Sequence, residues 1–378
     1  YSDYQIQDRS FSTDTYKIAG FFAPVRDVRF RGGYNRAVRA PNIQELFSAQ
    51  RVALDGTTDP CAGDFNPETA QDAPEASAAQ CALTGVSAAQ YGNINQNPAS
   101  QYNGLIGGNP NLDPEIADTW TVGVVIQPRF VPRFALTIDW FDIQVENAIQ
   151  ALGADNIITS CISTGDPFFC NLINRAPNGS LWLSQEGYII DLQENIGGVS
   201  TRGIDIGASY SMDIGSFGNL GFNFQGTWLD ELITDQGFGV EFDCVGFFGN
   251  QCGTPNPEWR HTARLTWQHP DGYGLTARWR YFGSVDVDDL SEDPDLASST
   301  PPLAANERLS SVNYLDLALS FRVGDHYNFR LGVNNILDRD PPLNGSQVCP
   351  AGPCNGNTWA QVYDALGRYV FAGVTLDF

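Results

Sequence analysis

Charge, lysine and long apolar runs are all scarce in this sequence of 378 residues. Charged residues make up 17% of it, against the ~25% usual in soluble domains. Lys17 is the single lysine, so arginine carries nearly all of the positive charge. The longest apolar run, near residues 20–25, is far shorter than the ~18 residues of a membrane helix and contains Pro24. The sequence therefore excludes a protein that crosses a membrane as helices.

The chain also lacks the features that nucleic-acid binding and catalysis require. Its net charge of −23 repels phosphate backbones, so we expect no nucleic-acid partner. It contains no Gly-x-Ser-x-Gly motif, and the three histidines, His261, His269 and His326, have no obvious nucleophile as a partner. We expect neither catalytic residues nor a cofactor.

Alternation of apolar and polar residues is the main signal that is present. Over residues 203–214 every second residue is apolar, with Asp205, Ser209 and Asp213 among those between. Successive side chains of a strand point to opposite faces, so this segment has one apolar and one polar face. The pattern predicts eleven strands, near residues 14–24, 25–38, 116–128, 133–147, 199–214, 218–231, 258–269, 273–284, 311–323, 326–337 and 367–378. A partial strand at residues 1–4 would make about twelve.

Three features favour a membrane barrel over a soluble antiparallel sheet, which would alternate as well. The strands run to about 10–13 residues, longer than the ~5–6 usual in soluble sheets. Trp and Tyr lie near the ends of the apolar faces, as in aromatic girdles. Short connections alternate with long ones at 39–115, 148–198, 230–257, 285–310 and 338–366. We predict an all-β, antiparallel transmembrane β-barrel with short periplasmic turns and long extracellular loops.

The eight cysteines all fall in the long connections. Spacing favours four disulfides, each within one loop: Cys61 with Cys81, Cys161 with Cys170, Cys244 with Cys252, and Cys349 with Cys354. Disulfides form in oxidising compartments, which fits loops that face the outside of a cell. A thiolate metal site is the alternative, but the sequence has no Cys-x-x-Cys pair.

Several segments resemble the TonB-dependent receptors of the bacterial outer membrane. Residues 34–47 (YNRAVRAPNIQELF) resemble a strand that ends before "R-A-P" and a helical turn ending "E-L-F". Residues 108–115 (GNPNLDPE) resemble the family's "G-N-P-x-L-x-P-E", and residues 331–338 (LGVNNILD) its "G-V-x-N-L-F-D". Gly367-Arg368-Tyr369 and the terminal Phe378 also fit. The matches keep the family's order from residue 34 to the end.

The resemblance implies a larger assembly than this sequence. It implies a barrel of about 22 strands with a plugged lumen, of which residues 1–378 supply about twelve as the C-terminal part. An N-terminal plug domain and the segment that contacts the TonB complex would lie upstream. Lipid, lipopolysaccharide and a surface lipoprotein would be partners in the outer membrane.

Candidate ligand-binding residues are loop aromatics and polar residues of the predicted lumen face. Trp182 and Trp359 could stack on a ligand, although packing inside folded loops is the favoured alternative. Arg278, Arg280 and Arg330, together with Arg29 and Arg31, have lumen-side parity; they would contact an anionic ligand or, as we favour, pair with plug acids. Asp286, Asp288 and Asp289 form a weak candidate Ca²⁺ site, against a solvated acidic loop as the favoured alternative.

Two classes of function follow. The first is active uptake of a scarce large solute, either an oligosaccharide or a ferric siderophore, with a slight preference for the carbohydrate. The second is a plug-free barrel that acts as a pore, adhesin or surface scaffold. A soluble β-sandwich lectin is a third reading, which would show itself by solubility without detergent.

Overall fold

The computed structural model describes residues 2–6, 9–63, 74–237, 240–297, 302–324, 326–345, 348, 354 and 357–376. It divides into two compact units. The loop unit comprises Tyr1–Asp14, Val38–Ile116 and Glu146–Gly198, and the sheet unit comprises Thr15–Ala37, Ala117–Val145 and Val199–Phe378.

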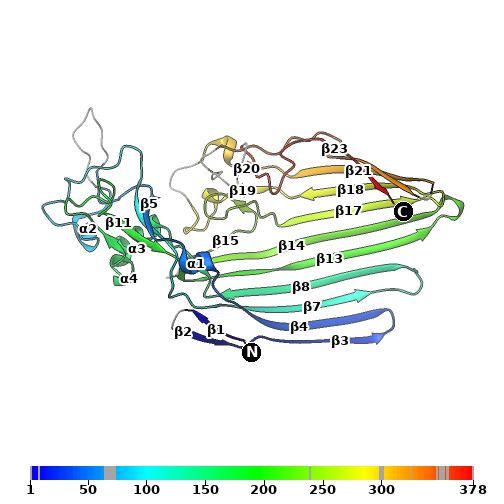
Figure 1. Cartoon of the computed structure of the whole chain (residues 1–378), viewed down its shortest axis with the longest axis horizontal. Helices are drawn as coiled ribbons and strands as arrows, with labels where there is room; N and C mark the ends of the chain where they lie inside the picture. Colours follow the sequence, from blue (N-terminus) through cyan, green and yellow to red (C-terminus); the bar gives the residue numbers. More distant parts are fainter. Residues whose placement is uncertain are drawn as a thin grey trace. The chain divides into compact units, whose positions relative to one another are not determined.

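The sheet unit is built on one large sheet (Figure 1). Its strand order is β23-β22-β21-β18-β17-β14-β13-β8-β7-β4-β3, with β15 paired to β14. The strands are β3 (Tyr16–Val25), β4 (Val28–Arg39), β7 (Glu115–Ile126), β8 (Phe134–Glu146), β13 (Gly198–Asp213), β14 (Asn219–Gly237), β15 (Val240–Asp243), β17 (Trp259–Gln268), β18 (Tyr273–Phe282), β21 (Val312–Val323), β22 (Tyr327–Asn334) and β23 (Tyr369–Leu376). All eleven long strands expected from alternation are confirmed, and their short turns lie together at one end of the sheet (Figure 1).

The expected partial strand at the start of the chain is wrong in its pairing. Residues 2–6 form β1 (Ser2–Ile6), which pairs with β2 (Arg9–Thr13) in a separate two-stranded sheet. The nearest complementary segment in sequence provides this partner, so a local hairpin forms. The twelfth strand of the large sheet is instead β15, because β14 extends six residues beyond its expected end at residue 231 and continues as a hairpin.

The two faces of the sheet differ as alternation requires. On the apolar face Val122 is 58% exposed and Phe22, opposite Phe30, is 67% exposed, so these side chains are not packed in a core. The other face, called the polar face below, contains Arg278, Arg280 and Asp316. The buried apolar residues lie in clusters within the long connections. None of the helices in the described residues is long and apolar enough to span a membrane.

The long connections of the sheet unit are folded. Short strands β16 (Phe247–Phe248), β19 (Val285–Val287) and β20 (Arg308–Leu309) form a three-stranded sheet, with 3₁₀ turns η2 (Asp288–Leu290) and η3 (Ala304–Asn306) nearby in sequence. A further 3₁₀ turn, η1 (Gly215–Phe217), lies in a short connection. Phe248, Val285, Tyr314, Trp359 and Tyr363 pack into one buried cluster.

The loop unit joins two connections that are far apart in sequence. Its central sheet has the order β10-β11-β6-β5, from Ile173–Asn174, Tyr188–Leu192, Tyr102–Gly107 and Arg51–Gly56, and β6 pairs with β11 in parallel. A second pair joins β9 (Ile149–Gln150) to β12 (Glu194–Asn195). The helices are α1 (Ile43–Phe47), α2 (Ala78–Leu83), α3 (Ala154–Thr164) and α4 (Pro167–Cys170).

Local sequence explains the start of this unit. Pro41 lacks the N–H that a sheet ladder needs, and β4 ends at Arg39 just before it. The Asn42 side chain then accepts from the N–H groups of Gln44 and Glu45, while Glu45 accepts from the N–H of Asn42. This capping box begins α1 and confirms the helical turn expected after "R-A-P".

Three of the four expected disulfides are present: Cys61–Cys81, Cys161–Cys170 and Cys244–Cys252. The fourth expected pair, Cys349 with Cys354, includes Cys349, which lies outside the described residues.

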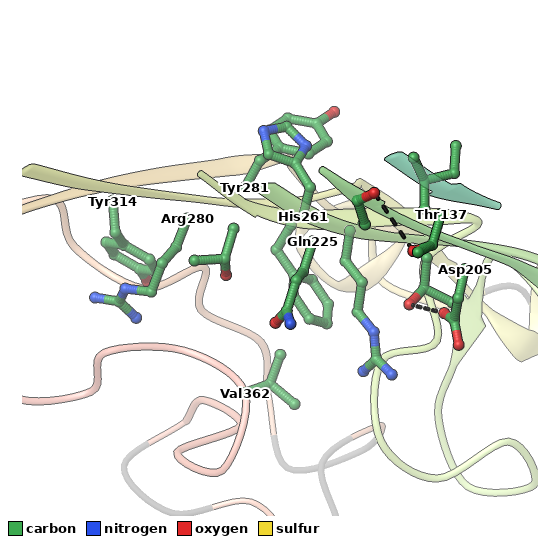
Figure 2. Close-up of a pocket in the computed structure, with 15 residues that line it drawn as sticks. Thr137, Asp205, Gln225, His261, Arg280, Tyr281, Tyr314 and Val362 are labelled. Atoms are coloured by element: carbon green, nitrogen blue, oxygen red, sulfur yellow. Dashed lines mark hydrogen bonds between the residues drawn. The ribbon is translucent and has the colours of Figure 1, made fainter. Parts of the chain in front are cut away.

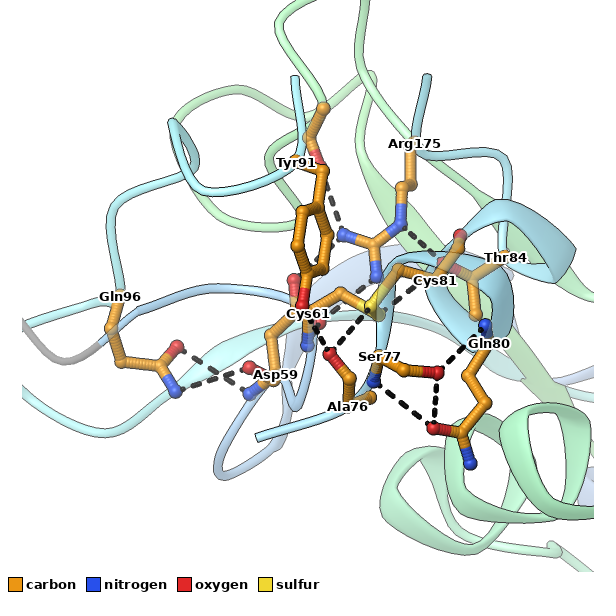
Figure 3. Close-up of a disulfide and its surroundings, with 11 residues drawn as sticks. Asp59, Cys61, Ala76, Ser77, Gln80, Cys81, Thr84, Tyr91, Gln96 and Arg175 are labelled. Carbon is orange, nitrogen blue, oxygen red and sulfur yellow. Dashed lines mark hydrogen bonds and ion pairs between the residues drawn. A yellow bond between two sulfur atoms is a disulfide. The ribbon is translucent and has the colours of Figure 1, made fainter. Parts of the chain in front are cut away.

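Near the Cys61–Cys81 disulfide, the buried side chain of Arg175 makes several hydrogen bonds (Figure 3). Arg175 donates to both carboxylate oxygens of Asp59, at 2.7 and 2.9 Å, and to Thr84 Oγ1 at 3.0 Å. The segment around Arg175 is thereby tied to the Cys61–Cys81 loop.

Candidate ligand-binding wall

A pocket of about 500 Å³ opens on the polar face of the sheet (Figure 2). Strand register brings its side chains together, because Gln225 lies opposite Thr262, which lies opposite Arg280, which lies opposite Tyr314. Val362, from the connection between β22 and β23, lies beneath this row in Figure 2. The pocket is therefore a strip of the sheet that is partly covered by a loop. The part of the polar face that lines this pocket and the second pocket described below is called the wall.

The neighbouring row of the same strands carries an arginine and an aspartate. Thr227 lies opposite Arg260, which lies opposite Phe282. The Asp205 carboxylate accepts from the Thr227 hydroxyl at 2.7 Å (Figure 2). Arg260 is exposed in the pocket and has no ion-pair partner among the described residues. Its positive charge is thus open to a ligand.

Arg280 is the most heavily bonded group of the wall. Its guanidinium donates to Asp316 through Nε at 2.9 Å and to Asp364 through two nitrogens at 3.0 and 2.6 Å. It also lies 4.8 Å above the Tyr314 ring. Arg278 donates to the same Asp316 at 2.7 Å. Asp316 is only 6% exposed at its side chain, so it is a fixed part of the wall.

A second pocket, of about 280 Å³, continues the polar face past Arg278. Arg264 lies directly opposite Arg278 and has no ion-pair partner in the described part of the chain. Arg330 lies 5.2 Å over the ring of Phe371, and this ring fills the place that a Cβ on Gly332 would take, at 2.2 Å. Arginines therefore outnumber acids along this part of the wall.

Comparison with known proteins identifies the family. The family model for TonB-dependent receptor-like β-barrels matches residues 1–336. The chain belongs to this family. Barrels of TonB-dependent receptors lie in the bacterial outer membrane, and so does this one. No curated protein matches the sequence.

Solved structures show the same fold. A mutant of the ferric enterobactin receptor PfeA from Pseudomonas aeruginosa is 14% identical at a TM-score of 0.56, over 96% of this chain and 40% of that one. The siderophore receptor PirA from Acinetobacter baumannii is 13% identical at a TM-score of 0.56, over 96% and 41%. The chain thus spans about two fifths of the length of these receptors.

The two loop tryptophans named from the sequence lie inside folded parts of the receptor barrel's connections. Trp359 is completely buried in the cluster with Phe248. Trp182 is half-buried against the core of the loop unit, and its indole N–H donates to the Asn95 carbonyl at 3.0 Å. Neither ring is fully open for stacking on a ligand.

The polar arginines named from the sequence lie on the polar face, and three of them pair with acids of the sheet. Arg278 and Arg280 pair with Asp316 on the adjacent strand, and Arg31 donates to Asp139 at 2.6 and 2.5 Å across β7. The sheet therefore supplies an acid on the same face for each of these guanidinium groups. Pairing with plug acids stays a prediction.

Two acids of the weak Ca²⁺ candidate site have partners within the protein. Asp286 pairs with Arg308, and Asp288 is 1% exposed and accepts from the N–H groups of Gln251 and Cys252 at 2.8 and 2.9 Å. Within the described residues no group of His, Cys, Asp or Glu is arranged to hold a metal ion. The favoured alternative, a solvated acidic loop, is also wrong for Asp288, because this carboxylate braces the Cys244–Cys252 hairpin.

Of the three histidines, His261 lies on the apolar face of the sheet. His261 stacks on Tyr281 at 5.2 Å and meets Trp279 edge-on at 4.4 Å, on the opposite side of the sheet from Gln225 and Arg280 (Figure 2). Its Nδ1 accepts from the Trp259 indole at 2.9 Å. His261 is therefore part of the aromatic belt of the apolar face.

Proposed function

We propose that this chain forms part of the wall of an outer-membrane receptor that takes up an anionic ferric siderophore, with energy supplied through TonB. The arginine-rich polar face carries the proposal. In a protein with a net charge of −23, five arginines line the pockets of this face: Arg260, Arg264, Arg278, Arg280 and Arg330. Guanidinium groups suit oxygen-rich anions because they donate in a planar fork.

The carbohydrate alternative loses two of its supporting residues. The slight preference for it came from long disulfide-linked loops and abundant Trp and Asn, and the two loop tryptophans are not open stacking platforms, because Trp359 is buried and Trp182 packs against the loop unit. The names of the similar solved structures, a ferric enterobactin receptor and a siderophore receptor, point the same way without fixing the solute. An anionic chelate accordingly replaces the oligosaccharide as the first candidate.

The remaining parts of the assembly belong to the same proposal. A plug domain and the remaining barrel strands would come from an upstream part of the protein, and that part would contact the TonB complex. The receptor would bind and move its solute without chemical change, so it is not an enzyme. Lipopolysaccharide and a surface lipoprotein stay predicted partners. A plug-free pore or adhesin is the alternative to be tested.

Transport in whole cells tests the proposal. Cells expressing the natural receptor receive radio-iron as a trianionic ferric tris-catecholate, and a labelled neutral oligosaccharide in a parallel arm. We expect binding and uptake of the chelate, with uptake but not binding lost when the proton gradient is dissipated. Changing Arg260 and Arg264 together to Gln should reduce chelate binding at least roughly ten-fold. Arg51→Gln, an exposed arginine of the loop unit, is the matched control.

Three outcomes would contradict it. Uptake that survives loss of the gradient favours the passive pore. Uptake of the oligosaccharide but not of the chelate would favour the hypothesis that the transported solute is a carbohydrate. Equal binding by the double variant and the Arg51 control removes the polar face as the binding site.

A further inference from the structure

The Asp364 carboxylate occupies one side of the Arg280 guanidinium. It comes from the connection between β22 and β23, and its two carboxylate oxygens accept from Arg280 at 3.0 and 2.6 Å. Its backbone N–H donates to the Tyr314 hydroxyl at 3.2 Å. Val362, two residues earlier, lines the main pocket. The connection is thus held on the wall at the place where an anion would meet Arg280.

The two acids on Arg280 are not equivalent. Asp316 is 6% exposed at its side chain and also accepts from Arg278 and from the N–H of Asn335 at 2.8 Å. Removing it would leave Arg278 without its acid partner and Arg280 with Asp364 alone. Asp364 is 23% exposed and sits on a connection rather than a strand. Asp364 is therefore the exchangeable acid, and Asp316 is the permanent one.

Arg260, which has no ion-pair partner in the described part of the chain, lies beside the exchangeable pair. Arg260 is two residues along β17 from Thr262, the residue opposite Arg280, and it lines the same pocket. Asp205, the acid of the same pocket, already accepts a hydrogen bond from Thr227. An anion with several oxygens could bind Arg260 first and then take the two Arg280 nitrogens from Asp364. The exchange needs no change in the bonds of Asp316.

We propose that Asp364 is an internal competitor for the transported anion, so that binding of the anion at Arg260 and Arg280 displaces the Asp364 carboxylate and loosens the backbone at residues 364–367, while Trp359 and Tyr363 stay in their buried cluster. The inference rests on the proposed function, because it assigns the anion of that function to one site. Asp364 lowers the affinity of the site, since an anion must first break the pair. By the same linkage, anions bound at Arg280 favour the state in which Asp364 is displaced. Asp364 thereby excludes weakly charged solutes and admits those with enough negative charge to replace it.

Binding and hydrogen exchange test the exchange of anions. The natural receptor in detergent micelles is titrated with a trianionic ferric tris-catecholate and, separately, with citrate, which carries carboxylates but no iron. Asp364→Asn keeps the side-chain shape and removes the charge. Asp340→Asn, in the same connection but away from Arg280, is the matched control. Exchange is followed in peptides that cover residues 357–368.

We expect Asp364→Asn to bind the chelate roughly three- to ten-fold more tightly than wild type at low salt, since one charge-assisted pair no longer competes. The backbone amides of residues 364–367 should exchange faster in this variant even without ligand. In wild type, either anion should raise exchange at the Asp364 amide, and Asp340→Asn should behave as wild type does. Arg260→Gln should weaken this response.

Failure of the inference is separable from failure of the proposed function. A response to citrate without any chelate binding supports the anion exchange and overturns the ferric siderophore as solute. Chelate binding that Asp364→Asn leaves unchanged or weakens, relative to Asp340→Asn, overturns the role of Asp364. The same holds if neither anion alters exchange at residues 357–368 in wild type.

Discussion

Loss of Arg175 should unfold part of the loop unit while leaving the sheet in place. The side chains of Arg175 and Asp59 are each 3% exposed, so their ion pair is almost fully removed from water. Arg175 also donates to Thr84 Oγ1 at 3.0 Å and to the Gly179 carbonyl at 2.9 Å. Four hydrogen bonds thus depend on one guanidinium. Arg175→Met would leave the Asp59 carboxylate buried and uncompensated.

The expected cost follows from that burial. Removing one partner of a buried ion pair destabilises by about 3–5 kcal/mol, far more than the ~0–1 kcal/mol of an exposed pair. Lysine should recover only part of the loss, because it lacks the planar fork that meets both Asp59 oxygens. Asp59 also accepts from the N–H of Cys61, so its reorientation would disturb the adjacent disulfide.

Hydrogen exchange measures the effect within the unit. Opening free energies are compared for peptides of residues 74–96 and 171–192 in wild type, Arg175→Met, Arg175→Lys and the exposed-arginine control Arg51→Met. The double variant Asp59→Asn with Arg175→Met should cost less than the sum of the single changes, because no lone charge remains buried. The reasoning is refuted if Arg175→Met and Arg51→Met differ by less than about 0.5 kcal/mol.

Two further predictions concern a glycine of the sheet and an acid pair of the loop unit. A Cβ on Gly123 would lie 1.9 Å from the Asp139 carboxylate, which Arg31 meets across β7, so Gly123→Ala should destabilise the folded barrel by roughly 1–3 kcal/mol. The measurement is the temperature at which the band of the folded protein disappears on a denaturing gel. Gly20→Ala is the control, because nothing lies within 4 Å of a Cβ at that site. In the loop unit, the pKa of Asp55 is raised to about 7. The larger cause is the partial burial of its carboxyl, and the second is the negative charge of Asp191. The folded unit therefore holds a proton that the unfolded chain loses near pH ~4, so stability should fall between about pH 4 and 7 and stay low above it. Asp55→Asn should flatten this slope in melting experiments, and an unchanged slope would contradict the assignment.

The strands could be predicted because each one carries its own signal. Period-two alternation depends only on neighbouring residues, so β18 and β21 could be located within two residues at each end without knowledge of their partners. The same parity rule, applied to the strand at residues 258–269, would have added Arg260 and Arg264 to the candidate site. Those two arginines were missed although the signal was present.

Other features depend on contacts between distant segments, and no local pattern reports them. The pairing of Gly104 with Ile189 builds the core of the loop unit from two connections that the sequence presents as separate loops. Asp364 lies in a stretch without periodicity, so its place on Arg280 could not be derived. Asp288 shows the same limit, because one acid among many becomes buried only when the hairpin at Gly249 folds around it.

The parallel pairing of β6 with β11 has a consequence for recognition from outside the cell. A surface patch that spans these two strands is assembled from residues about 85 positions apart, for example Leu105 beside Ile190. A synthetic peptide copied from either stretch would lack half of the shape, so antisera raised against such peptides should ignore the native bacterium. A substitution in one stretch would likewise be constrained by the stretch that it faces, so tolerated changes there should occur as paired replacements.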